Sequence, residues 1–203
     1  MMKVFKMLRY PILDGIYFPF KIYQKTKIRI RASADFKLDG RITFGNSDKK
    51  AAVISAIPAN LYLGFKSKIR IGHSVSIGPG VNIIVKDNAN LIIEENTYFT
   101  SDLHIEVVNV VQIGKNCAIS WGGTIIDDDH HTISYADKNE NGRNHVKIGD
   151  HVWIGCNCVI LKGTEVGNNC VIAAGSVVKG VFPENCLIGG NPAKILKRNI
   201  TWR

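Results

Sequence analysis

The sequence has no uninterrupted apolar run long enough to cross a membrane. The N-terminal residues 1–25 are apolar and basic, but Pro11, Asp14 and Pro19 interrupt them, whereas a transmembrane helix needs roughly 20 consecutive apolar residues. No small-residue cleavage site of the A-x-A kind follows this segment, as a secretory signal would require. We therefore expect neither a membrane-spanning helix nor a signal peptide.

Two interpretations of this N-terminal segment stay open. Lys3, Lys6 and Arg9 would share one helical face beside apolar residues, and a basic amphipathic helix can rest on an anionic bilayer surface. The same helix could instead pack on its own protein or on a neighbouring subunit. The first interpretation predicts peripheral association with the inner face of a membrane.

Paired cysteine motifs are also absent. The five cysteines are odd in number, and none has the C-x-x-C spacing of a zinc site or a thioredoxin-like motif. Small buried thiols in a reducing compartment are the simpler interpretation. We therefore expect a cytoplasmic protein.

The charge balance favours an anionic partner. The 26 Lys+Arg residues exceed the 17 Asp+Glu residues and give a net charge of +9, which suits a nucleic acid, an acidic membrane surface, a phosphorylated cofactor or an acidic glycan. A chain of 203 residues with 45% hydrophobic residues can bury one core. We therefore expect one domain with small terminal additions.

A six-residue spacing of aliphatic residues dominates the second half of the chain. This period fits neither a helix, whose apolar positions recur three and four apart, nor a strand with strict alternation. It fits short strands joined by corners, in which three sides make one coil and the coils stack as parallel β-structure. The unbroken series is Ile148, Ile154, Ile160, Val166, Ile172 and Val178.

The same spacing occurs earlier in the chain, with two interruptions. The spacing breaks between Ile105 and Ile113, which predicts a bulge or a short loop between them. Residues 127–145 are polar and carry no repeat position, so we expect a loop that extends from the rigid coil. We assign residues 1–40 to an N-terminal extension, 41–190 to the coil and 191–203 to a basic C-terminal helix or tail.

The six-residue spacing of aliphatic residues is followed by GGNPAK at residues 189–194. Together they resemble the hexapeptide-repeat acyltransferase family over about residues 69–197. The resemblance implies an all-β fold, a single-stranded left-handed parallel β-helix of hexapeptide coils with an extruded active-site loop. Here an N-terminal extension and a short C-terminal helix would flank it. The resemblance also implies a homotrimer with active sites between subunits. The chain is most similar to the sugar and capsule polysaccharide branch, which includes maltose, galactoside and sialic acid O-acetyltransferases.

That branch implies an activity and its reactants. The expected activity is acetyl-CoA-dependent O-acetyl transfer, with acetyl-CoA as co-substrate. The expected acceptor is a saccharide hydroxyl of a bacterial surface polysaccharide or its precursor, and not a nucleic acid. An enzyme that N-acetylates an amino sugar, or an antibiotic acetyltransferase, would have much the same residues in the cofactor-binding half of the chain. Both stay alternatives.

The loop sequence DDDHHTI, residues 127–133, is similar to the D-x-D-x-H motif of that branch. The similarity makes His131 the general base and leaves His130 at the variable position. The chemistry favours a histidine independently, because an alcohol that attacks a thioester must lose its proton and an imidazole is mostly neutral at physiological pH. In an extended segment Asp127, Asp129 and His131 project to one side, so Asp129 could orient the ring. A shift of one residue, with His130 facing the reaction, stays open.

A metal site is the main rival for this stretch. Related folds include gamma-class carbonic anhydrases, which hold zinc with histidines from stacked coils. His104, His130, His131 and His145 could converge, but the sequence has no His-x-x-x-x-His pair, and zinc needs several ligands in a fixed geometry. We expect no metal. A β-helix scaffold without chemistry is the rival from a different class.

The resemblance assigns the cofactor contacts to the second half of the chain. It places Trp153 at the thioester end of acetyl-CoA, beside the reaction, and the ring should point outward because the next residue, Ile154, points inward. Cys156 and Ala174 fall beside the pantetheine arm. The phosphates would meet three ammonium groups, which suit their charge: Lys179, Lys194 and Lys197.

Part of this assignment has a structural alternative. The C-terminal lysines also fit the polar face of a short helix that packs through its apolar side chains, Trp202 among them. On the acceptor side, Thr100, His104 and Glu106 should face outward, and Asp102 lies close by. Asp102 and His104 are the candidate residues for binding sugar hydroxyls.

Overall fold

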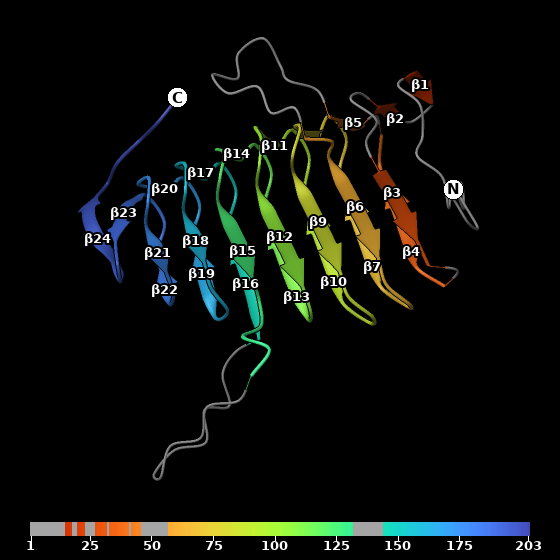
Figure 1. Ribbon diagram of the computed structural model, residues 1–203. Helices are drawn as coiled ribbons and strands as arrows, with labels where there is room; N and C mark the ends of the chain where they lie inside the picture. Colours follow the sequence, from red (N-terminus) through yellow and green to blue (C-terminus); the bar gives the residue numbers. More distant parts are fainter. Residues whose placement is uncertain are drawn as a thin grey trace.

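The computed structural model describes residues 15–17, 20–22, 27–31, 33–40, 42–45, 57–131 and 144–203. Three sheets form the sides of a parallel β-helix whose coils stack along one axis (Figure 1). Among the described residues no helix could span a membrane. The helical interpretations of Lys3, Lys6 and Arg9 fall outside the described residues.

The strands of each sheet come from successive coils. Sheet B contains β3 (Lys27–Ile30), β6 (Asn60–Leu63), β9 (Asn82–Val85), β12 (His104–Val107), β15 (Thr124–Ile126), β18 (Val159–Ile160) and β21 (Val177–Val178). Sheet C contains β4 (Asp35–Leu38), β7 (Lys68–Ile71), β10 (Asn90–Ile93), β13 (Val110–Ile113), β16 (His145–Ile148), β19 (Thr164–Val166) and β22 (Val181–Phe182).

Sheet A forms the third side and is longer at both ends. Its parallel strands are β5 (Ile42–Phe44), β8 (Ser76–Ile77), β11 (Tyr98–Phe99), β14 (Ala118–Ile119), β17 (Trp153–Ile154), β20 (Val171–Ile172) and β23 (Cys186–Gly190). The hairpin of β1 (Gly15–Tyr17) and β2 (Phe20–Ile22) extends one end, and β24 (Ala193–Arg198) extends the other as an antiparallel partner of β23.

The predicted inward positions form the core. All six residues of the unbroken series, from Ile148 to Val178, are at most 3% exposed. The first five each lie in register with an equivalent in the next coil, as Ile160 does with Val178. Burial of one such aliphatic side chain contributes about 1.5–3 kcal/mol. Each coil therefore stabilises its neighbours through matching side chains.

Left-handed corners let the chain turn between the strands. Seven of the non-glycine residues with positive φ are asparagines: Asn88, Asn96, Asn116, Asn157, Asn169, Asn185 and Asn199. Asparagine adopts this region more readily than most residues. His130 and His151 share the same conformation, with φ of 58° and 53°. The Asn-rich corners thus have a steric cause.

The predicted interruption near Ile105 is a short turn. β12 and β13 are four-residue strands, and only Val108 and Asn109 separate them. Buried Asp127 of the next coil closes this turn, because its two carboxylate oxygens accept the N–H groups of Val108 and Asn109, both at 2.8 Å. Burial raises the pKa of Asp127, although these hydrogen bonds oppose the shift.

The ends of the coil differ from expectation. β3 and β4 already pair in parallel with β6 and β7, so the β-helix includes residues that the sequence assigned to the extension of 1–40. The short helix expected within 191–203 is wrong, because β24 occupies that segment. An open edge at β23 would leave backbone N–H and C=O groups unpaired, and β24 pairs with this edge in the antiparallel direction.

We expect Asp127→Asn to lower the free energy of unfolding by about 1–3 kcal/mol, because the new amide N–H would face a backbone N–H and leave it unsatisfied. Urea denaturation measures the change. The matched control is Asp35→Asn, since the exposed Asp35 carboxylate has Lys37, at 3.5 Å, as its one ion-pair partner within the described part of the chain, and such a pair contributes at most about 1 kcal/mol. Equal urea midpoints for wild type and Asp127→Asn would contradict the role of Asp127.

The cysteines give a second prediction. Cys117, Cys158, Cys170 and Cys186 are buried, and burial raises the pKa of Cys117 to about 11. Because thiolates are the reactive form, a maleimide at neutral pH should modify half-buried Cys156 first. Peptide mass spectrometry of native and urea-unfolded protein measures this order, and native-state labelling of the four buried thiols at the rate of Cys156 would refute it.

Candidate functional site

The charged loop sequence leaves the coil at the corner between sheets B and C. Only its first part, up to His131, and its return at residue 144 are described. Asp127 is buried, whereas Asp129 and His131 are exposed, so these three side chains do not share one side. The Asp129 carboxylate contacts the Lys162 ammonium at 2.7 Å. Among the described residues, no carboxylate forms an ion pair with the His131 ring.

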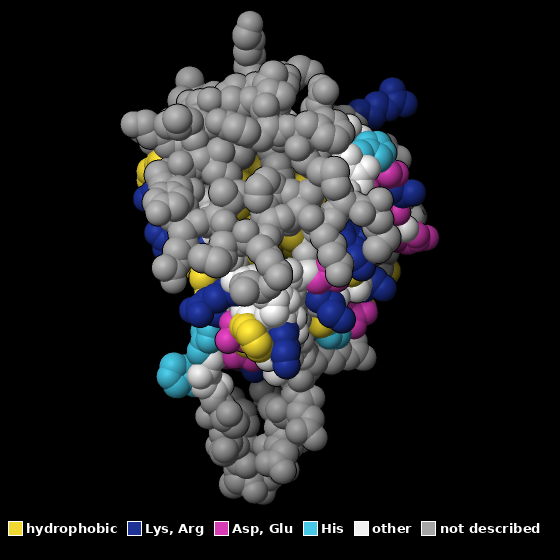
Figure 2. Space-filling model, turned by 90° about the vertical axis from the view of Figure 1, so that its right-hand side faces the viewer, with side chains coloured by type: hydrophobic (Ala, Val, Ile, Leu, Met, Phe, Trp, Pro, Cys, Tyr) yellow, Lys and Arg dark blue, Asp and Glu magenta, His cyan; other side chains and the backbone are white. Residues whose placement is uncertain are grey.

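His130 is held against the coil, in contrast to His131. Its N–H donates to Asp128 Oδ1 at 2.7 Å, and its Nε2 lies 3.4 Å from Glu106 Oε2. The other Glu106 oxygen contacts Lys86 Nζ at 2.8 Å. Burial opposes ionisation of Glu106, but the hydrogen bond and charge of Lys86, with the charge of His130, outweigh it and lower the pKa of Glu106. Figure 2 shows histidine side chains at the lower edge, where the loop leaves the coil.

A ladder of polar side chains crosses the outer face of sheet B toward Glu106. Asn60 Nδ2 donates to Asn82 Oδ1 at 2.6 Å, and Asn82 Nδ2 lies 3.0 Å from His104 Nδ1. Because the amide nitrogen only donates, His104 Nδ1 accepts and the ring hydrogen sits on Nε2, which lies 3.7 Å from Glu106 Oε2. His104 is therefore part of an ordered polar network.

Asp102 lies in a different setting from His104. It is a half-buried corner residue with φ of 50°, and its N–H donates to Pro79 O at 3.0 Å. Beside it, the hydroxyls of Thr100 and Ser101 are buried without a hydrogen-bond partner among the described residues. Buried polar groups without partners are rare, so these two hydroxyls distinguish this corner from the others.

Trp153 points outward from sheet A, as predicted. Its side chain is 43% exposed, and its Nε1–H lies 3.4 Å from Ser120 Oγ, which accepts it. Two residues after Trp153 lies buried Gly155, and its equivalent in the next coil is Ala173, so this position is small in both coils. A Cβ at Gly155 would lie 2.6 Å from the backbone nitrogen of Ala174, so close stacking of the coils requires glycine there.

The residues predicted for the pantetheine arm lie at the next corner. Half-buried Cys156 follows β17, and exposed Ala174 occupies the corresponding corner one coil later. The two corners stack directly, since the N–H of Gly175 donates to Cys156 O at 2.9 Å.

The three predicted lysines separate into two groups. Lys194 and Lys197 pair with Gly189 and Leu187 across the β23–β24 hairpin, where a register shift lies between Leu187 and Ile188. Directly opposite residues share a face of a sheet, so both lysines project from the outer face that carries Trp153. Lys179 instead follows β21 of sheet B.

One row of sheet A connects the indole to a lysine. Trp153, Val171 and Leu187 are in register on β17, β20 and β23, and Lys197 continues the row on β24. His131 lies at the corner between sheets B and C, and no described contact joins it to Trp153. Within one chain the predicted base and the predicted cofactor site therefore face different directions.

The histidines considered for a metal site do not gather in one place. His104 and His130 meet at Glu106, whereas His145 on sheet C contacts Glu165 at 3.1 Å. The described part of the chain holds no group of three or more metal-ligating side chains with suitable geometry.

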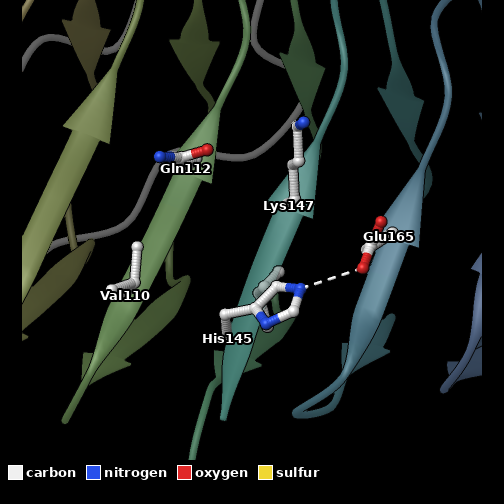
Figure 3. Close-up of a pocket in the computed structure, with 6 residues that line it drawn as sticks. Val110, Gln112, His145, Lys147 and Glu165 are labelled. Atoms are coloured by element: carbon white, nitrogen blue, oxygen red, sulfur yellow. Dashed lines mark hydrogen bonds and ion pairs between the residues drawn. The ribbon is translucent and has the colours of Figure 1, made fainter. Parts of the chain in front are cut away.

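A hollow of about 400 Å³ opens beside His145, lined also by Val110, Gln112, Lys147 and Glu165 (Figure 3). It lies on the outer face of sheet C, where the loop returns to the coil. Sequence reasoning did not select this hollow.

Sequence reasoning also missed Lys162, the ion pairs of Glu106 and the contacts of Trp202. Glu106 alternates with inward residues on β12, which predicts its outward direction but not its partners. Lys162 and Trp202 come from later parts of the chain, and nothing in their local sequence indicates contact with Asp129 or with the residues near Trp153.

Known proteins with similar sequences indicate the family of this chain. Residues 145–180 match the family model described as bacterial transferase hexapeptide (six repeats). A protein assigned as the lipopolysaccharide biosynthesis O-acetyl transferase WbbJ of Escherichia coli K12 is 30% identical over 68% of this chain and 75% of its own length. An uncharacterised 24.8 kDa protein from the cps region of Klebsiella pneumoniae is 32% identical over 88% and 79%.

A solved structure supports the same relationship. The polysialic acid O-acetyltransferase OatWY is 27% identical and superposes with a TM-score of 0.53, over 91% of this chain and 90% of that chain. The stacked parallel coils, the predicted inward series and these relatives agree. The chain belongs to the hexapeptide-repeat transferase family and has its left-handed parallel β-helix fold.

Proposed function

We propose that the protein is an acetyl-CoA-dependent O-acetyltransferase that acts on a hydroxyl group of a saccharide, within a bacterial surface polysaccharide or its precursor. The observation that carries the proposal is the row from Trp153 to Lys197 on one outer face. The names of WbbJ and OatWY support O-acetyl transfer, and the net charge of +9 suits an acidic glycan. The free cysteines fit a cytoplasmic location.

The outer face of sheet A suits an extended thioester cofactor. Adjacent strands lie about 4.8 Å apart, so roughly 15 Å separate Trp153 from Lys197 across three strand steps. The indole would meet the acetyl end, and the ammonium groups of Lys194 and Lys197 would meet phosphates. Between them lie the small residues Gly155 and Ala173, so no bulky side chain at these two positions would block the arm.

The pantetheine arm and the remaining phosphate contact involve the corner beyond this row. Cys156 and Ala174 would flank the arm at the stacked corners after β17 and β20. Lys179 follows β21 of sheet B, so it would reach a phosphate only around the corner of the coil. Lys194 and Lys197 are therefore the stronger candidates for the phosphates.

The proposed reaction requires one base. As the acceptor oxygen attacks the thioester carbonyl, the imidazole of His131 takes the hydroxyl proton, a C–O ester bond forms and the C–S bond breaks. The sulfur leaves as a thiolate and is then protonated. Asp129, two residues away and held by Lys162, is the nearby carboxylate that would orient the ring. Asp102 and His104 would bind acceptor hydroxyls beside the network around Glu106.

The directions of these groups favour an assembly. His131 leaves the coil at the corner of sheets B and C, whereas Trp153 faces outward from sheet A. A neighbouring copy would bring the two together, so we propose a homotrimer with active sites between subunits. The unpartnered hydroxyls of Thr100 and Ser101 are consistent with a corner completed by a neighbour or a ligand.

We expect His131→Ala to lower kcat at least about a hundredfold, which is typical of losing a general base. Isothermal titration with CoA should give an unchanged affinity, because the ring does not hold the cofactor. The control is His130→Ala, which removes the contact with Glu106 and should retain most of the activity. An inactive His130→Ala with an active His131→Ala would move the base to His130.

The acceptor class gives a separate prediction. Incubation with acetyl-CoA and either neutral sugars, sialylated glycans, amino sugars or an antibiotic acceptor should give O-linked acetyl esters on the first two groups. Mass spectrometry identifies the products, and mild alkali should release the acetyl group from an ester but not from an amide. A product that is purely amine-linked would replace the O-acetyl proposal with N-acetyl transfer.

A further inference from the structure

The C-terminal tail returns from the end of the coil toward Trp153. After β24 the chain turns at Asn199, with φ of 56°, and the N–H of Ile200 donates to Asn185 O at 3.1 Å. The Trp202 Nε1–H then donates to His151 O at 2.9 Å. Asn185 and His151 are corner residues of different coils, so the tail runs back across the stack beside sheet A (Figure 1).

Trp202 is held in one orientation at this corner. Its ring stacks on the His151 imidazole, with centroids 4.1 Å apart and planes 6° from parallel. His151 is itself fixed, because its Nδ1 lies 3.1 Å from Asn169 Oδ1. The hydrogen bond acts in the plane of the Trp202 indole and the stacking acts on its face, so together they restrict its orientation.

The same indole contacts Trp153. The two ring centroids lie 6.1 Å apart with the planes at 44°, which is a favourable tilted geometry for an aromatic pair. With Trp202 in place Trp153 is 43% exposed, and its described hydrogen bond to Ser120 is long, at 3.4 Å. A half-exposed side chain with weak contacts can occupy several rotamers, so the contact with Trp202 restricts the Trp153 ring.

We propose that Trp202 is a positioning residue, which holds the Trp153 indole in the orientation that receives the acetyl end of acetyl-CoA. This inference rests on the proposed function, which puts that end of the cofactor at Trp153. A pre-arranged indole lowers the ordering cost of binding. Loss of Trp202 therefore weakens cofactor binding more than it slows the transfer step.

Fluorescence tests the contact without reference to activity. In a Trp121→Phe background, the variants Trp202→Phe and Trp202→Ala both leave Trp153 as the sole tryptophan. We expect a larger acrylamide quenching constant for Trp153 in the Ala variant, because Phe retains a ring over His151 and Ala does not. Equal quenching in the two variants would overturn the inference, since Trp202 would then not cover Trp153.

Steady-state kinetics of the full-length protein tests the consequence. Loss of an aromatic pair predicts that Trp202→Ala raises KM for acetyl-CoA about three- to tenfold, with kcat within about twofold. Trp202→Phe should recover much of the wild-type KM. Thr201→Ala is the matched control, because Thr201 is exposed in the same tail and should leave both constants unchanged.

The outcomes separate this inference from the proposed function. If Trp202→Ala loses activity at an unchanged KM, the tail serves only to keep the protein folded and the inference is overturned, while the proposed function stands. If wild type neither binds CoA nor transfers acetyl groups, the proposed function fails and this inference fails with it. The fluorescence comparison still decides whether Trp202 covers Trp153.

Discussion

The in-register stacking of coils is the constraint on which the rest of the structure depends. An inward aliphatic side chain is buried only when its equivalents in the adjoining coils cover it, as Ile160 and Val178 do. Register in a sheet fixes which residues face inward and which face outward. The outward residues therefore form straight rows, and a side chain on one coil acquires neighbours of the same row from the coils beside it.

This constraint decides where chemistry can occur. The row through Trp153 and the ladder through His104 lie on different sheets, and the corner that carries His131 is separate from the outer face of sheet A. A rigid coil cannot bend to join them, so the chain brings distant groups together with segments outside the repeat. The loop supplies His130, which meets Glu106, and the tail supplies Trp202, which meets Trp153.

The predictions from sequence succeeded where the repeat acts and failed where it stops. The outward direction of Trp153 follows from its neighbour Ile154, and the structure agrees. The short C-terminal helix was wrong because apolar residues such as Ile195 and Leu196 fit a helical face and a bulged edge strand equally well, and the open edge of β23 decided between them. The single side expected for Asp127, Asp129 and His131 assumed an extended segment, but Asp127 is buried while the other two are exposed, and His130 has a left-handed conformation.

Residue spacing alone was enough to predict the coil, its inward positions, the point at which the loop leaves it and the family to which the chain belongs. These depend on residues near one another in the chain, whose spacing reports the local backbone period. The partners of Glu106, Asp129 and Trp153 are seen only in the folded chain. Those contacts join residues from separate coils or from the tail, and sequence spacing contains no measure of distance between segments that fold back on one another.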